Sequence, residues 1–136
     1  MREIKFRGDK IGSKQWVYGN LILGLNNTCH IAIINNDPIE KQSRSWYINT
    51  PCFGVIPESV GQFTGLQDKN GVDIYEGDIA IWKINDVIRT ASIYYDELQA
   101  SFWMGKSKEN GFLTLNDWMR GEYEIIGNIH ENPELL

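Results

Sequence analysis

The segment from Gly61 to Ile79 constrains the fold of this chain more than any other part of its sequence. Four glycines divide it into short extended pieces, and the central run Asp68-Lys69-Asn70-Gly71 has the polar and glycine residues of a tight hairpin turn. The last of the four glycines, Gly77, precedes the apolar run at residues 78–84. The segment therefore predicts a β-hairpin that leads into a buried strand, with glycines at positive φ in the turns.

Alternating apolar and charged residues predict another strand at the N-terminus. In residues 4–7 the apolar side chains alternate with Lys5 and Arg7, so the two cations are expected to face solvent. Apolar, β-branched and aromatic runs predict three more strands, over residues 15–23, 28–34 and 45–49. Residues 50–60 contain two prolines, and we expect an extended connector there with one helical turn at residues 57–60.

The remainder of the chain has a series of short strands and no long apolar period of 3.6 residues. The strands are expected over residues 78–84, 87–95, 100–104, 112–115 and 122–129. A turn at Asn85-Asp86 separates the first two, and a single helical turn is expected at residues 116–120. This order matches the plan of an SH3-like barrel. We therefore predict a mainly β protein with an N-terminal β sub-domain and connector, residues 1–60, followed by a small SH3-like β-barrel with an extended tail, residues 61–136.

The composition is that of a folded protein with one domain or two small sub-domains. A chain of 136 residues, of which 42% are apolar, can bury a core without disulfides. No stretch approaches the roughly 20 apolar residues that span a bilayer, and residues 1–7 lack the apolar core of a signal peptide. Cys29 and Cys52 are expected to be reduced, mostly buried thiols. These features predict a cytoplasmic protein.

The net charge of −5 is unevenly distributed along the chain. Residues 1–60 carry seven Lys or Arg against five acids, whereas residues 61–136 carry six against thirteen. The acidic second part argues against nucleic-acid binding by the whole surface. The first part contains a basic edge made of Arg2, Lys5, Arg7, Lys10 and Lys14. With Phe6, Trp16 and Tyr18 beside it, this edge is a candidate nucleic-acid site; the alternative is a basic edge that prevents strand pairing.

Three blocks at the start, middle and end of the chain carry a resemblance to a known family. They are residues 1–7, residues 60–71 with 74–79, and residues 126–136. In this order they closely resemble the YopX family of phage and prophage proteins. The resemblance implies a protein encoded by a bacteriophage or an integrated prophage, and hence a place in the bacterial host cell. It implies no activity and no catalytic residues.

Residues with catalytic or metal-binding chemistry form no recognisable constellation. The Cys and His side chains, which lack any Cys-x-x-Cys or His-x-x-x-His pair, are Cys29, His30, Cys52 and His130. Glu76 and Asp78 could form an acid pair, but hydrogen bonding of Asp78 to turn amides is the preferred interpretation. The glycine spacing matches no phosphate-binding loop. We therefore predict no catalytic residues, no metal and no cofactor.

These observations favour a non-enzymatic phage or prophage accessory protein that acts by binding. Its partner is expected to be a host or phage protein, or further copies of itself in a homo-oligomer, with no membrane association. Nucleic-acid binding through the basic N-terminal hairpin is the alternative function, and an undetected small hydrolase is a third.

Overall fold

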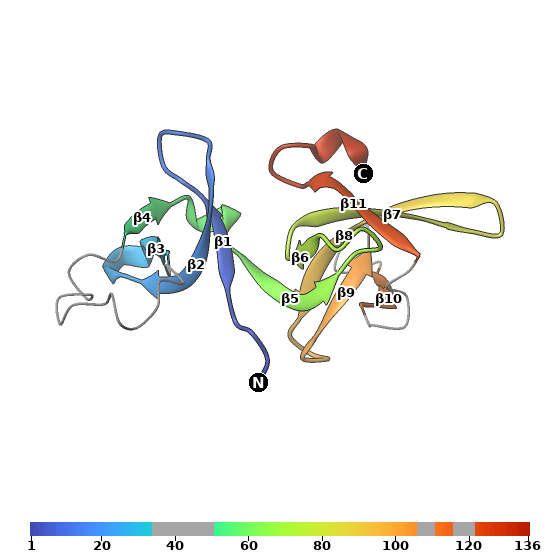
Figure 1. Ribbon diagram of the computed structural model, residues 1–136, viewed down its shortest axis with the longest axis horizontal. Helices are drawn as coiled ribbons and strands as arrows, with labels where there is room; N and C mark the ends of the chain where they lie inside the picture. The colour runs from blue at the N-terminus through green and yellow to red at the C-terminus, as the bar shows by residue number, and fades with distance from the viewer. Residues whose placement is uncertain (34–50, 106–110, 116–121) are drawn as a thin grey trace. The chain divides into compact units, whose positions relative to one another are not determined.

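The computed structural model describes residues 1–33, 51–105, 111–115 and 122–136 (Figure 1). These residues form eleven β-strands and three short 3₁₀ helices, and no α-helix occurs among them. None of these helices is long and apolar enough to cross a membrane. The prediction of a mainly β protein is therefore confirmed. The strand predicted at residues 45–49 and the helical turn predicted at 116–120 lie outside the described residues.

The chain divides into two compact units. Residues 4–60 form one, the N-terminal unit, and residues 1–3 together with 61–136 form the other, the C-terminal unit. Each unit has its own apolar core. The prediction that residues 1–60 and 61–136 are separate sub-domains stays a prediction.

The N-terminal unit is built on four antiparallel strands with the order β4-β3-β2-β1. Its elements are β1 (Phe6–Asp9), β2 (Trp16–Leu23), η1 (Leu25–Asn27), β3 (Cys29–Ala32), β4 (Cys52–Val55) and η3 (Pro57–Ser59). The core contains Val17, Ile31 and Val55. A Cβ at Gly8 would lie 2.8 Å from the Val55 Cβ atom, so β1 passes over this core at a distance that only glycine permits.

Two boundaries in this unit differ from the sequence-based expectation. The first strand begins at Phe6, and Ile4 is 57% exposed where it was expected to face a core. The connector at residues 50–60 contains the strand β4, which was not predicted. Its prolines, Pro51 and Pro57, flank the strand without interrupting it, and a proline next to a strand removes no hydrogen bond from its interior. The helical turn predicted at residues 57–60 is confirmed as η3.

The C-terminal unit combines a hairpin with a five-stranded antiparallel sheet. Its elements are β5 (Gly61–Gln67), β6 (Asp73–Tyr75), β7 (Asp78–Ile84), β8 (Val87–Asp96), β9 (Ser101–Gly105), β10 (Gly111–Thr114), β11 (Tyr123–Asn128) and η6 (Pro133–Leu135). The hairpin joins β5 to β6, and the sheet has the order β10-β9-β8-β7-β11. The predicted hairpin and the predicted strand at residues 78–84 are confirmed.

One face of this sheet buries the core of the C-terminal unit. The alternation of β8 turns Ala91 and Ile93 inward, and their cross-strand partners Ala80 and Met104 are also fully buried. Tyr123 from β11 completes the set with no exposed surface. The pairings leave β10 and β11 at the two edges, and no closed barrel is detected in the described part of the chain. The antiparallel strands of the predicted SH3-like barrel are thus confirmed, whereas its closure is not.

A buried carboxylate, that of Asp68, links the hairpin turn to the sheet. Its Oδ1 atom accepts hydrogen bonds from the amides of Asn70 at 2.8 Å and Val72 at 2.9 Å, and Oδ2 accepts one from the Ile125 amide at 3.0 Å. The residue is 3% exposed. The same side chain therefore shapes the turn between β5 and β6 and attaches it to β11, across 57 positions of sequence.

The four glycines of the hairpin segment serve two different purposes. Gly65, Gly71 and Gly77 have φ angles of +86°, +80° and +82°, which confirms their predicted positive φ. Gly71 and Gly77 lie in turns, whereas Gly65 lies within β5, where the pairing with β6 shifts its register. Gly61 was assigned the same conformation, and for it the prediction is wrong because its φ is not positive. A Cβ there would lie 2.5 Å from the Glu76 carbonyl oxygen, so the strand needs glycine for close approach.

We expect Asp68→Asn to lower the free energy of unfolding of the C-terminal unit by about 2 kcal/mol, because an amide NH₂ replaces one of two buried acceptor oxygens. The matched control is Lys69→Ala, which removes an exposed ion pair with Glu124 at 2.7 Å and should change the same quantity by about 0.5 kcal/mol or less. Urea denaturation measures both. Equal effects of the two substitutions would contradict this role for Asp68.

Candidate functional site

The five basic residues proposed from the sequence are divided between the two units. Arg2 belongs to the C-terminal unit, whereas Lys5, Arg7, Lys10 and Lys14 belong to the N-terminal unit. Of these four, Lys14 is exposed, Lys5 and Lys10 are partly buried, and Arg7 is buried. A continuous basic stripe over all five is therefore not present within either unit.

The prediction that Arg7 faces solvent is wrong. Its side chain is 6% exposed, and its guanidinium carbon lies 4.8 Å from the centroid of the Trp16 ring. Lys10 is engaged in a similar way, with its Nζ atom 4.4 Å from the centroid of the Phe53 ring. Period-2 alternation assigns a side chain to one face of a strand and cannot tell whether aromatic rings cover that face. Both cations thus contribute to the packing of the N-terminal unit.

The Glu76 and Asp78 carboxylates of the hairpin segment accept hydrogen bonds from backbone amides. Asp78, which is 2% exposed, accepts a hydrogen bond from the Tyr75 amide at 2.8 Å. Glu76 accepts one from the Gln62 amide at 2.9 Å. The preferred interpretation of Asp78 as a turn-forming residue is confirmed. The Glu76 and Asp78 carboxylates therefore each have a structural hydrogen bond in the hairpin.

The two cysteines lie at opposite ends of the β3–β4 pair. Cys29 is opposite Val55 and Cys52 is opposite Ala32, so about 10 Å of strand separates the two positions. Cys29 is partly buried, but Cys52 is exposed, which corrects the expectation of mostly buried thiols. Among the described residues, no three His, Cys, Asp or Glu side chains come together in a group that could hold a metal ion.

The closing run of the chain is organised by a buried side chain, that of Asn128. Its Oδ1 atom accepts hydrogen bonds from the amides of His130 and Glu131, each at 3.0 Å. Its Nδ2 atom donates to the Glu131 carboxylate at 2.7 Å. His130 itself is exposed. The residues of this run that carry the family resemblance are therefore those that shape the turn after β11.

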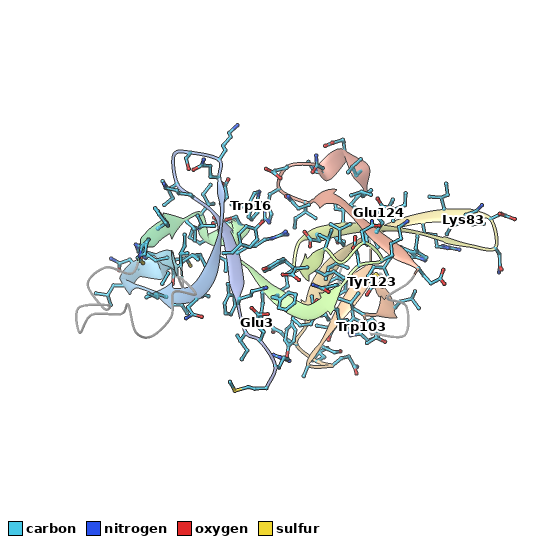
Figure 2. All side chains as sticks on the ribbon, in the orientation of Figure 1. Glu3, Trp16, Lys83, Trp103, Tyr123 and Glu124 are labelled. Carbon is cyan, nitrogen blue, oxygen red and sulfur yellow. The ribbon has the colours of Figure 1, made fainter. Side chains whose placement is uncertain are left out.

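The hairpin formed by β7 and β8 projects beyond the rest of its sheet (Figure 1). In the described residues β11 pairs with β7 only from Asp78 to Trp82, and β9 pairs with β8 only from Ser92 onward. Residues 83–89, the projecting arm, extend past both neighbouring strands, and Figure 2 shows Lys83 on it. Its tip is the predicted turn at Asn85-Asp86, with φ angles of 49° and 64° as in type I′ hairpins.

The projecting arm presents apolar side chains to solvent on both faces. Val87 is 51% exposed and Ile88 is 66% exposed. Because they are successive residues of one strand, their side chains point to opposite faces of the ribbon. Lys83 lies opposite Ile88 and forms an exposed ion pair with Asp86 at 2.7 Å. The arm therefore combines an exposed apolar pair with charges of both signs at its tip.

A cavity of about 300 Å³, the Tyr95 pocket, lies at the other end of β8. Its lining residues are Arg2, Gln62, Tyr95, Ala100, Ser101, Phe102 and Leu115. The rings of Tyr95 and Phe102 meet edge to face with centroids 5.3 Å apart. In the part of the chain that the structure describes, the side chains of Arg2, Gln62 and Tyr95 have no hydrogen-bond or ion-pair partner. The pocket thus has an aromatic wall and three available polar groups.

Tyr94, beside this pocket in sequence, lies on the opposite face of β8. Burial raises the pKa of its phenol above the ordinary value of 10.0, and the negative charge of Asp96 raises it further. Its cross-strand partner is Trp103, whose indole donates a hydrogen bond to Ser101 at 2.9 Å. The folded protein therefore favours the neutral form of this phenol more than water does.

Sequence reasoning missed both the projecting arm and the Tyr95 pocket. The run Val87-Ile88-Arg89 gave the signal for a strand, but nothing local indicates that β9 and β11 stop short of it. The pocket gathers Arg2, Gln62 and Tyr95 from three distant parts of the chain. Only the spatial arrangement brings these groups together.

Comparisons with known proteins give a family and a related fold. The family model described as YopX protein matches residues 5–136. A crystal structure of protein EF1440 from Enterococcus faecalis is similar, with 25% sequence identity and a TM-score of 0.53, covering 100% of this chain and 99% of that one. No curated protein matches the chain.

We expect the free energy of unfolding to fall as the pH rises above 10 through the raised pKa of Tyr94 in the folded state. The phenol keeps its proton longer when folded, so its contribution is complete below pH 10.0 and is lost above the folded pKa. Tyr94→Phe removes the ionisation and should make the decline shallower. Urea denaturation of the unchanged chain and of Tyr94→Phe from pH 8 to 12 measures the free energy of unfolding. Identical slopes of this free energy against pH would refute the raised pKa of Tyr94.

Proposed function

The chain belongs to the YopX family, and within that family we propose that it is a non-enzymatic binding protein that uses its projecting arm to engage a protein partner. The observation that carries this proposal is the exposure of Val87 and Ile88 on an arm that extends past its neighbouring strands. An exposed apolar ribbon of this kind lowers solubility and has no role in burying the core. We infer that this surface, exposed in the free chain, is buried against another protein in a complex.

The geometry of the arm favours enclosure by its partner over contact with one side. Its apolar side chains point to both faces, so covering one face leaves the other in water. The strand edges of residues 83–89 also carry backbone groups that can pair with an incoming strand. Full burial of a Val or Ile side chain contributes roughly 1.5–3 kcal/mol, and about half of that remains available at each of these exposed positions.

We assign the partner to a host or phage protein, with a second copy of this chain as the competing occupant. The charge distribution supports association with a surface of mixed sign, because Lys83, Asp86 and Arg89 surround the apolar pair. The family resemblance supports our proposal that the chain is an accessory protein of a phage or prophage in the bacterial cell. The involvement of Asp68, Glu76 and Asp78 in structural hydrogen bonds supports binding over catalysis.

We expect Ile88→Glu to abolish retention of the partner, because it places a charge in the buried part of the contact. The new carboxylate lies opposite Lys83, which limits its effect on folding. The matched control is Leu98→Glu, which changes an apolar residue that is 94% exposed in the same unit but outside the arm. Capture from bacterial lysate, together with the mass of the isolated chain in solution, measures the effect.

Two outcomes would contradict the proposal. One is a strictly monomeric chain that retains no protein, and the other is equal loss of binding with Ile88→Glu and Leu98→Glu. A defined oligomer that dissociates with Ile88→Glu alone would assign the arm to self-association.

Nucleic-acid binding by the N-terminal unit remains the second candidate function. It is supported by Tyr18, which is 48% exposed beside Arg7, and by the exposed Lys14. Arg7 and Lys10 lie against aromatic rings, which makes these two cations less accessible to phosphates. This arrangement supports the second candidate less than the first.

We expect weak or absent retention of single- and double-stranded DNA and RNA, even at low salt. Filter binding with the intact chain and with Lys14→Glu measures it. Tight retention that falls steeply with salt and is reduced by Lys14→Glu would instead support the nucleic-acid function.

A further inference from the structure

The Tyr95 pocket combines features that the projecting arm does not use. Its volume of about 300 Å³ is at the lower end of the range for small-ligand pockets, so it suits a group about the size of one aromatic amino acid. The edge-to-face pair of Tyr95 and Phe102 provides an apolar wall against which a flat or branched group can pack. Leu115, which is 8% exposed, adds to the apolar lining.

The available polar groups of the pocket select for a negative charge. Arg2 is the one cation among the described residues that line the pocket, and its guanidinium offers a planar fork of donors that matches a carboxylate. Its aliphatic stem lies against β5, since its Cγ atom is 3.9 Å from the position of a Cβ on Gly65. The Gln62 amide and the Tyr95 hydroxyl have no partners among the described residues and can complete the hydrogen bonding of a bound carboxylate.

Other classes of ligand fit these groups less well. A phosphate is usually held by several cations or by converging backbone amides, and the lining that the structure describes has a single cation. The excess of acids in residues 61–136 also opposes a polyanion. A cationic ligand would suit two aromatic rings, but Arg2 would repel it.

The rim of the pocket is already shaped before any ligand binds. The turn between β8 and β9 is fixed by a hydrogen bond from the Gln99 amide to the Asp96 carboxylate at 2.9 Å. At the end of this turn Ala100 has a φ of +50°, a conformation that costs a residue with a side chain about 1 kcal/mol or more. A defined rim lowers the ordering that binding requires.

We propose that the Tyr95 pocket binds a compact aromatic or branched apolar group that carries one carboxylate. The carboxylate pairs with Arg2 and the apolar group packs on Tyr95 and Phe102. Such a ligand is either a free small acid or the C-terminal residue of a peptide. This site is separate from the projecting arm, and its occupancy goes beyond the function proposed above.

The test is titration of the intact chain with N-acetyl-L-phenylalanine, followed through the side-chain amide signals of Gln62 by NMR. We expect a dissociation constant of about 1 mM, which is reasonable for a ligand of this size. The amide-capped form of the same compound lacks the carboxylate and should bind about tenfold more weakly. A hexapeptide with a free C-terminal phenylalanine, with its amide-capped form as the control, distinguishes the two sources. Tighter binding of the hexapeptide than of N-acetyl-L-phenylalanine indicates a peptide terminus, and the reverse order indicates a free acid.

Arg2→Gln should weaken binding of the free acid about tenfold and leave binding of the capped form unchanged. The matched control is Arg89→Gln, an identical change in the same unit but on the projecting arm, which should alter binding less than twofold. Both positions are exposed, so neither substitution disturbs the core. Ile88→Glu should bind the acid normally even if it loses the protein partner, so the two proposals fail independently.

Three results would overturn the proposal. They are equal affinity for the free and capped compounds, equal effects of Arg2→Gln and Arg89→Gln, and no change in the Gln62 signals at about ten times the expected dissociation constant.

Discussion

The carboxylate of Asp68 is the interaction on which the C-terminal unit depends. It accepts backbone amides from its own turn and from β11, and so fixes the β5–β6 hairpin against the edge of the sheet. The hairpin places Gln62 in the Tyr95 pocket, and β11 ends its pairing with β7 at Trp82. The Asp68 side chain thus links the hairpin that carries Gln62 to the strand that borders the projecting arm.

The two surfaces lie at opposite ends of the same strand. Residues 88 and 95 of β8 are separated by about 23 Å of extended chain, which is too far for one small ligand to contact both. The exposed arm suits a macromolecular partner, and the pocket suits a compact anion. A scaffold with separate sites for a protein and a small acidic group can bind both at once.

The sequence predicted features that depend on neighbouring residues and missed those that depend on distant ones. The β5–β6 hairpin, the Asn85-Asp86 turn and the hydrogen bonding of Asp78 all follow from glycine and Asx chemistry within a few positions. The prediction that Arg7 is exposed to solvent was wrong because Trp16, on the neighbouring strand, lies against it on the same face. The arm is defined by where β9 and β11 stop, and the pocket by residues far apart in the chain. Neither leaves a local pattern that a single sequence reveals.

The central claim is that the arm at residues 83–89 is the surface buried by a partner. Amide hydrogen exchange of the free chain, compared with that of the complex or oligomer recovered from bacterial lysate, tests it most directly. The account predicts that exchange across residues 83–89 slows in the assembly, because enclosure removes these amides from water. Unchanged exchange in this segment, with protection appearing elsewhere in the chain, would contradict it.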